Sequence, residues 1–516
     1  MQQASKDPGV KSFWQQNGII YTLIALTAGA FVWLNLKTAM LVAPWIDEAA
    51  VVDAGVNLHL GKGWFSTAWG SQSQFEFWAA NNPIYTLLIY WWVSIVGIAP
   101  VAVRSMNYLI LLATCWIIAD ACRRSGILPS LWSRLFVAAI VACDEAVAYV
   151  YRDARDDLTT LCVVALLFWC FVSVSDPRRR RRLLFLCALP ILSAGIQAIP
   201  YIFLLLCFDY LVERKLRIAD IGAVVAGTAT GGVALLSFLA LKHALTAFMI
   251  QTFVSGFNIF GCTLQVIIFK DRVATNKLMG MIKALSPIRV VEKISTDRSL
   301  WPLILFLLVV AVFGYFQQKQ WKLKRAAILG LIVALLIPYG MLAAGRYEFY
   351  YAWMGAVPLA IVFVVTLERC RGEHARFLMA GGVLAGLASI LLGLPWELWT
   401  EIHTISPDAY RIEGQQLDRE IRPGDTLFGD PIFYYFAKQQ GLPIMMTTYS
   451  GGRGYRNMRE AERASISILI MRPWDVEQSL KRVGGSWTTV DNLQSPYGFP
   501  LVVMRRAAHV QPPPGF

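Results

Sequence analysis

Long apolar runs alternate with short polar and basic segments along the first 394 residues of the chain. A membrane-spanning α-helix needs about 20 apolar residues, and the runs approach or exceed that length. The pattern therefore predicts an α-helical polytopic membrane protein with about eleven transmembrane helices plus juxtamembrane helices. The predicted spans are 18–43, 101–121, 135–150, 158–174, 183–212 (interpreted as two short spans), 218–241, 301–316, 326–343, 352–367 and 377–394.

Basic clusters between the runs orient the predicted spans, because Lys and Arg accumulate in cytoplasmic loops. The N-terminus and the arginine run 178–182 are assigned to the cytoplasm on this basis. If the short, Trp- and Tyr-rich run 83–98 also crossed the membrane, YRDARDD (151–157) and the arginine run would fall on the wrong sides. Run 83–98 is therefore interpreted as an interfacial helix, a depth that aromatic amphipathic segments favour. The loops 44–82 and 242–300 are expected on the outer side of the membrane.

From residue 395 onward the composition changes to that of a soluble domain. The stretch 422–446 reads as strand, turn, helix and strand, and ASISILIMRP and PLVVMRR read as further strands. Residues 395–516 are predicted to form a small α/β domain outside the membrane. Residues 1–394 form the predicted transmembrane module.

Overall composition agrees with a membrane protein and narrows the classes of partner. Of the 516 residues, 56% are hydrophobic and 13% are aromatic, which is more apolar than a soluble protein of this length. The net charge of +13 is attributed to cytoplasmic loops, so no nucleic-acid partner is expected. The nine Cys and five His show no ligand spacing, so no His/Cys metal site is expected.

The unusual charged residues fall on the predicted outer face. Asp47 and Glu48 follow the first span, Lys62 and Glu76 lie in the same loop, and YRDARDD occupies 151–157. A charge beside hydrocarbon is costly to desolvate, which favours a functional role. A carboxylate can accept a proton from an attacking hydroxyl, and arginines can hold a phosphate. Together these groups predict group transfer from a lipid phosphate to an acceptor outside the cytoplasm.

Each cluster also has a simpler interpretation. The acids of the first loop could be solvated loop residues, and the 151–157 cluster could be a charge network at a helix end. The arginine run is most simply a topology signal that meets anionic lipid headgroups. Asp144 and Glu145 fall inside the predicted span 135–150, and no role is assigned to them.

The order of these motifs resembles the GT-C superfamily of polyprenyl-phosphate-dependent membrane glycosyltransferases. This superfamily includes the protein O-mannosyltransferases and the aminoarabinose transferase of lipid A. The resemblance covers about residues 15 to 395 and implies a GT-C-like fold. The residues that carry it are DE (47–48), LHLGKGWF (58–65), NNPIYTLLIYWW (81–92), Arg104, YRDARDDL (151–158) and GRYEFYYAW (345–353) with Pro358.

The resemblance also implies roles for individual residues. Asp47 matches the catalytic acid of the first loop, which acts as the base toward the acceptor, with Glu48 as its supporting neighbour. Glu76 falls where relatives place a second acid. Relatives carry a lysine beside that acid, whereas this chain reads FWAANNP. Contacts to substrate and lipid phosphate are therefore expected from the other candidates on the outer face: Lys62, Arg152, Arg155, Asp157, Arg346, Tyr347 and Tyr350. The two tyrosines could instead form part of an aromatic belt at the membrane interface.

The function that the sequence predicts is an inverting glycosyltransferase of the bacterial inner membrane. Its N-terminus would be cytoplasmic, and its C-terminal domain would be periplasmic, covering the site or helping to bind the acceptor. A polyprenyl-phosphate sugar would be the donor, and a cell-envelope glycan, lipid A or lipopolysaccharide, or a protein would be the acceptor. The alternatives are a transporter or flippase of lipid-linked sugars and a polymerase or ligase of lipid-linked glycans.

The sequence identifies no certain cofactor: this reaction needs no nucleotide-sugar site, and the chain shows no GxGxxG or P-loop motif. A divalent cation remains an alternative. Oxygen ligands from Asp47, Glu48 and Asp157 would suit Mg²⁺ or Mn²⁺.

Overall fold

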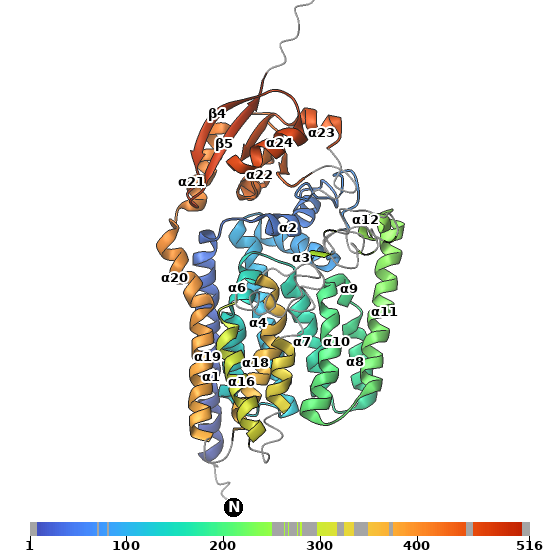
Figure 1. The fold of residues 1–516 in the computed structure, drawn as a ribbon, viewed down its shortest axis with the longest axis vertical. Helices are drawn as coiled ribbons and strands as arrows, with labels where there is room; N and C mark the ends of the chain where they lie inside the picture. Colours follow the sequence, from blue (N-terminus) through green and yellow to red (C-terminus); the bar gives the residue numbers. More distant parts are fainter. Residues whose placement is uncertain are drawn as a thin grey trace, which may run out of the picture.

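The computed structural model describes residues 8–69, 72–79, 82–249, 297–316, 325–334, 349–370, 375–449 and 458–507, with five separate positions between 263 and 280. Its helices form an upright bundle, with the N-terminus at one end and a small domain with a β-sheet at the other (Figure 1).

Apolar helices of different lengths build the bundle. They are α1 (Pro8–Thr38), α4 (Pro100–Ser125), α5 (Leu131–Cys143), α6 (Glu145–Arg152), α7 (Asp157–Ser173), α8 (Pro177–Ala188), α9 (Ile191–Ala194), α10 (Ile199–Phe208), α11 (Ile218–Leu241), α12 (Leu245–Met249), α16 (Leu300–Phe316), Arg325–Ala334, α18 (Trp353–Glu368) and α19 (Ala375–Leu392). Short 3-10 or π segments adjoin them: η1 (Ala39–Leu41), η2 (Ile196–Ala198), η3 (Asp209–Glu213) and η6 (Phe349–Ala352). Among the described residues, four helices are long and apolar enough to cross a membrane, or five if α6 and α7 form one bent span. The total of about eleven spans therefore stays a prediction.

The run 135–150, predicted as one span, is divided into two helices in the structure. The Asp144 side chain accepts a hydrogen bond from the Val147 N–H over 2.9 Å and so caps a new helix, α6. A carboxylate at this position satisfies an amide that has no partner within the helix. Asp144 and Glu145 therefore lie at a helix start and not within a continuous span.

The arginine run also differs from its prediction as a loop, because it lies in the first turns of α8. Asp176 caps this helix by accepting hydrogen bonds from the N–H groups of Arg178 and Arg179. Pro177 takes the first helical position, where its fixed φ and missing N–H cost nothing.

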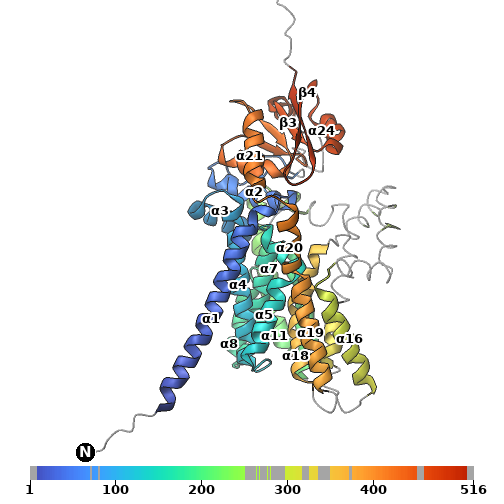
Figure 2. The same ribbon diagram turned by 90° about the vertical axis from the view of Figure 1, so that its left-hand side faces the viewer.

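Two further helices lie across the end of the bundle that is nearest the sheet domain (Figures 1 and 2). They are α2 (Ile46–His59), within the predicted first loop, and α3 (Pro83–Val96), and they pack against each other. The interpretation of run 83–98 as an interfacial helix stays a prediction.

A small C-terminal sheet is present, as predicted. Its strand order is β2-β1-β3-β5-β4, with β1 parallel to β2 and β3, and β5 antiparallel to β3 and β4. The strands are β1 (Leu427–Gly429), β2 (Ile444–Met446), β3 (Ile468–Met471), β4 (Trp487–Gln494) and β5 (Pro500–Arg506). The helical elements after α19 are α20 (Leu394–Thr404), α21 (Ala409–Glu420), η7 (Pro431–Phe433), α22 (Tyr434–Gln439), α23 (Glu460–Ser465), η9 (Pro473–Asp475) and α24 (Val476–Val483).

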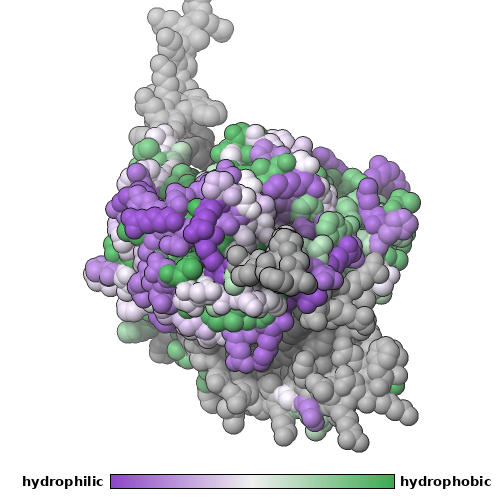
Figure 3. All heavy atoms as spheres, turned by 90° about the horizontal axis from the view of Figure 1, so that it is seen from above, coloured by the Kyte–Doolittle hydropathy of each residue, from purple (hydrophilic) through white to green (hydrophobic). Residues whose placement is uncertain are grey.

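The surfaces of the two parts differ in polarity. Seen from the domain end, the surface is mainly hydrophilic with small apolar patches (Figure 3). In contrast, the helices of the bundle expose large apolar side chains such as Leu26, Phe377 and Leu384. Large apolar side chains exposed on long apolar helices are compatible with a surface that faces lipid.

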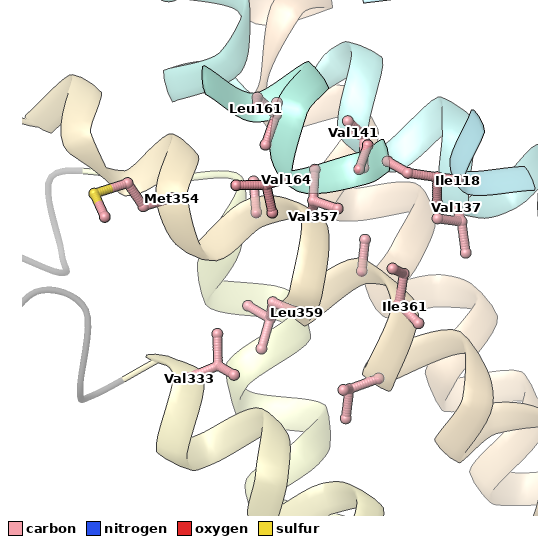
Figure 4. Close-up of a cluster of buried hydrophobic side chains, with 14 of the residues drawn as sticks. Ile118, Val137, Val141, Leu161, Val164, Val333, Met354, Val357, Leu359 and Ile361 are labelled. Atoms are coloured by element: carbon pink, nitrogen blue, oxygen red, sulfur yellow. The ribbon is translucent and has the colours of Figure 1, made fainter. Parts of the chain in front are cut away.

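Hydrophobic cores link the elements. Buried aliphatic residues fill the bundle interior between α4, α5, α7 and α18 (Figure 4). A second core is shared between the α2–α3 layer and the sheet domain, since Val52 and Ile89 belong to the same buried cluster as Ile432, Phe433 and Ile468. The sheet domain is therefore packed directly on the helix that carries Asp47.

Candidate functional site

Asp47 and Glu48 lie in the first turn of α2, where the helix dipole stabilises negative charge. Neighbouring residues on an α-helix are about 100° apart around its axis, so the two carboxylates point to different partners. Their surroundings differ accordingly. The Asp47 side chain is 22% exposed, whereas Glu48 is fully buried.

Asp47 forms an ion pair with Arg155, which lies between α6 and α7. Arg155 Nη1 donates to Asp47 Oδ2 over 2.7 Å, and its Nε donates to Asp157 Oδ2 over 2.9 Å. The Arg155 guanidinium also lies 5.8 Å from the ring centroid of Trp45, which packs edge-to-face against Tyr149. Of the two carboxylates that bind Arg155, Asp47 is the accessible one, because Asp157 is buried.

The turn that presents Arg155 has an unusual backbone. Ala154 adopts a left-handed φ of 46°, which L-residues other than Asn and Asp rarely accept. Tyr85 of α3 donates a hydrogen bond to the Ala154 carbonyl over 2.5 Å, and Asn107 of α4 donates to the Arg155 carbonyl over 2.9 Å. Contacts from two other helices therefore hold this turn, and with it the direction of the Arg155 side chain.

Glu48 is engaged inside the protein. Its two oxygens accept hydrogen bonds from Arg104 of α4 over 2.8 and 2.6 Å, and Tyr435 of α22 donates a third over 2.8 Å. Arg104 also donates to the carbonyls of Ala39 and Val42 just before α2. Glu48 thus anchors the start of α2 and does not face the surface beside Asp47.

A third acid of α2, Asp53, is fully buried and strongly bound. It accepts hydrogen bonds from the Thr67 N–H over 2.7 Å and from the Ser66 hydroxyl over 2.9 Å. Lys438 of α22 forms an ion pair with it over 2.7 Å, and Tyr434 donates a hydrogen bond over 3.1 Å.

Arg152 pairs with two carboxylates of α20. Its two terminal nitrogens bind the carboxylate of Glu401 in α20 over 2.8 and 2.5 Å, and Glu397 lies 3.7 Å away. The Arg152 side chain is buried and connects α6 to α20. Its predicted contact with a lipid phosphate stays a prediction that this geometry does not favour.

Lys62 and Glu76 lie in the segment that follows α2. The helix from Asp47 to His59 is about 18 Å long at 1.5 Å per residue, so Lys62 is at the opposite end of α2 from Asp47. Partial burial, and then the charge of Lys438, lower the pKa of the exposed Lys62. Glu76 is half-buried in a turn where its N–H donates to the Ser73 carbonyl.

The remaining predicted contacts are less defined. Arg346 and Tyr347 lie outside the described residues. Tyr350 belongs to η6, immediately before α18.

The oxygen ligands predicted for a divalent cation are not assembled as a metal site. Asp47 and Asp157 are both bound to Arg155, and Glu48 is bound to Arg104. Across the part of the chain that the structure describes, no three His, Cys, Asp or Glu residues are arranged to hold a metal ion.

Sequence reasoning did not identify Tyr434, Tyr435 and Lys438 as neighbours of α2. Their segment, FYYFAKQQ, reads as an ordinary amphipathic helix of a soluble domain. Asn82 was also missed as a site residue. It lies in FWAANNP (77–83), the stretch that differs from the GT-C relatives, and its side-chain amide donates a hydrogen bond to Asp156. Only tertiary structure reveals these contacts, because the partners are far apart in the chain.

An apolar pocket of about 70 Å³ lies inside the bundle between α4, α7, α10, the helix Arg325–Ala334 and α18. Five of its lining residues are labelled in Figure 4: Ile118, Val164, Val333, Val357 and Ile361. Aliphatic and aromatic side chains line it, and the hydroxyl of Tyr201 is already bound to the Met354 carbonyl.

Comparison of the sequence with known protein families and with curated proteins finds no match. Solved structures are similar. The crystal structure of ArnT from Cupriavidus metallidurans bound to undecaprenyl phosphate has a TM-score of 0.55 and 13% identity, covering 96% of this chain and 99% of that chain. The apo state of the same ArnT has a TM-score of 0.58 and 13% identity, covering 95% and 99%. At this identity the likeness establishes the fold, which extends over the bundle and the sheet domain.

Proposed function

We propose that this protein is an inverting glycosyltransferase that moves a sugar from a polyprenyl-phosphate donor to an acceptor at the outer face of the bacterial inner membrane. The observation that carries the proposal is the accessible Asp47 carboxylate bound to Arg155 at the end of an apolar helical bundle. The fold is shared along its whole length with ArnT, which was crystallised with undecaprenyl phosphate.

In the proposed reaction, Asp47 takes the proton of an acceptor hydroxyl. The acceptor oxygen then attacks the anomeric carbon of the sugar. The bond between that carbon and the phosphate oxygen breaks, and its electron pair leaves with the polyprenyl phosphate. One displacement of this kind inverts the anomeric configuration. A positioned base typically contributes about 10² to 10⁴ in rate.

Arg155 would serve the reaction in two ways. It fixes one oxygen of Asp47. Its positive charge would also stabilise the charge on a departing phosphate oxygen, an effect that is strong in a site with little water. Asp157 holds the Arg155 Nε and thereby sets the direction of the guanidinium.

The apolar pocket of the bundle supports a lipid-linked donor. Its aliphatic and aromatic lining suits isoprenoid units. A donor anchored in this way would keep its phosphate at the end of the bundle and its sugar outside hydrocarbon. Lys62, Glu76, Arg346, Tyr347 and Tyr350 remain proposed contacts for the phosphate, the sugar or the acceptor, which would be a cell-envelope glycan, lipid A or lipopolysaccharide, or a protein.

A transfer assay with purified protein tests the proposal. Protein in lipid nanodiscs is incubated with a set of synthetic polyprenyl-phosphate sugars and with envelope glycolipids, and the products are identified by mass spectrometry. Wild-type protein should release polyprenyl phosphate and form a glycosylated product of inverted configuration. Asp47→Asn should lose transfer. Asp491→Asn makes the same change at an exposed acid of β4, so it is the matched control and should remain active. Transport of intact donor without release of polyprenyl phosphate would refute the proposal.

A further inference from the structure

The acid-bearing helix α2 and the short helix α22 form an extensive polar contact. Tyr434, Tyr435 and Lys438 of α22 all direct their polar atoms at α2, and all three are buried. Tyr435 reaches Glu48 at the start of α2, and Tyr434 reaches Asp53 one and a half turns later. About 380 residues of chain separate these partners.

Lys438 extends the contact toward the far end of α2. Its ammonium group lies 2.7 Å from Asp53 and donates to the Asn57 side chain over 2.5 Å. A buried carboxylate without a partner is strongly destabilising. Asp53 takes its ion-pair partner from the sheet domain, and Glu48 takes one of its three hydrogen bonds from it, so the position of α2 depends in part on groups that this domain supplies.

The backbone after α2 is bound to the same domain. Thr67 accepts a hydrogen bond from the Met446 N–H over 3.0 Å and donates one to the Ile444 carbonyl over 2.7 Å. Both partners belong to β2, so Thr67 binds the edge strand of the sheet. Thr448 donates to the Ala68 carbonyl next to them. The sheet domain therefore holds α2 along its length and also at its exit.

The directions of the acids explain why this matters for Asp47. Glu48 and Asp53 point to different sides of α2, because five residues correspond to a rotation of about 140°. Fixing both carboxylates, one to Arg104 and Tyr435 and the other to Lys438 and Tyr434, fixes the rotation of α2 about its axis. That rotation decides whether Asp47 meets Arg155.

We infer that the C-terminal domain is a positioning element of the reaction site, in which Tyr435 and Lys438 of α22 set the orientation of α2 and thereby align Asp47 with Arg155. This inference rests on the proposed function for its kinetic consequence. Tyr435 and Lys438 are positioning residues that act through Glu48 and Asp53 and do not touch the substrate.

The first test is kinetic. Tyr435→Phe removes one hydroxyl and keeps the ring. It should lower kcat about ten-fold, a milder effect than the roughly 10²-fold cost of a 1 Å misplacement, and leave the KM for the donor within about two-fold. Tyr410→Phe is the matched control in the same domain, because the Tyr410 hydroxyl has no hydrogen-bond partner in the described structure. A raised donor KM with unchanged kcat would mean that Tyr435 contacts the donor, and would overturn the inference.

The second test needs no activity, so it separates this inference from the proposed function. Hydrogen–deuterium exchange of the full-length protein in nanodiscs follows the amides of α2. Lys438→Met should speed exchange there at least about three-fold, Lys438→Arg should restore much of the protection, and Tyr410→Phe should leave it unchanged. Equal exchange in Lys438→Met and wild type would overturn the positioning role even if Asp47 proves to be the base. The exchange result stands equally if no polyprenyl-phosphate sugar proves to be a donor.

Discussion

Arg155 donates a hydrogen bond to Asp47 over 2.7 Å, although the two residues are 108 positions apart in the chain. The contact joins the first turn of α2 to the strained turn between α6 and α7. It brings together the carboxylate of one predicted outer motif and the guanidinium of another. The proposed reaction depends on this pair.

Replacing Arg155 should reduce turnover and stability together. Arg155→Gln removes the charge that faces Asp47 and leaves the buried Asp157 without its ion pair. Breaking a buried pair costs about 3–5 kcal/mol, so the melting temperature in detergent should fall clearly. Sugar transfer by the protein that remains folded should fall about 10²-fold. Arg123→Gln, a change to a half-exposed arginine of α4, is the control and should retain activity. Normal transfer by Arg155→Gln would remove Arg155 from the site.

The two adjacent acids should respond differently to neutralisation. Glu48→Gln removes the nearest charged partner of the buried Arg104 and leaves it only Asp153, 4.0 Å away, so it should lower stability by about 3–5 kcal/mol. Asp47→Asn changes a partly exposed acid and should melt close to wild type. Thermal unfolding of both variants, followed by tryptophan fluorescence, measures the difference. Equal melting temperatures would contradict the structural role assigned to Glu48.

One residue of the arginine run should matter for packing and its neighbours should not. Arg180 Nε binds Asp220 of α11 over 2.6 Å, whereas Arg179 is exposed. Arg180→Gln should lower the melting temperature because Asp220 is then buried without its partner. Arg179→Gln, with the same loss of charge, should not. If both variants unfold like wild type, the run acts only through membrane topology.

Stability should depend on pH through Glu413 of α21. Burial raises the pKa of Glu413 to about 7 from an ordinary value of 4.5. An acid with a raised pKa in the folded state contributes stability that is complete below about pH 4.5 and is lost as the pH rises through 7. Each pKa unit corresponds to about 1.4 kcal/mol.

Glu413→Gln removes this titration. The melting temperature of the variant minus that of wild type should therefore be larger at pH 8 than at pH 5. Glu477→Gln, at an exposed position of α24, is the control and should show the same difference at both pH values. A pH-independent effect of Glu413→Gln would show that this carboxyl is not the group that titrates.

Much of the architecture could be predicted from the sequence because its causes are local. Apolar runs and their lengths indicate membrane helices, and the composition change after Pro395 indicates a separate sheet. Breaks inside apolar runs were harder to predict. Asp144 divides an apolar run by capping a new helix, whereas Asp176 caps a helix in an arginine segment that was predicted as a loop.

The site was predicted only in part for a related reason. Asp47, Arg155 and Asp157 belong to motifs with several charges each, so their chemistry was visible in the sequence. Tyr435 and Lys438 carry no local sign of their role, because their partners are defined by how the sheet domain docks on α2. Arg152 shows the converse, since a charged motif residue binds α20 instead of the site.

The most direct test of the central claim is the rate of sugar transfer by Asp47→Asn. The purified variant, in nanodiscs and with the polyprenyl-phosphate sugar that wild-type protein uses, should bind donor and melt normally. Its release of polyprenyl phosphate should fall by about 10² to 10⁴, because the acceptor hydroxyl has lost its base. Transfer at the wild-type rate by this variant would contradict the assignment of Asp47 and the mechanism built on it.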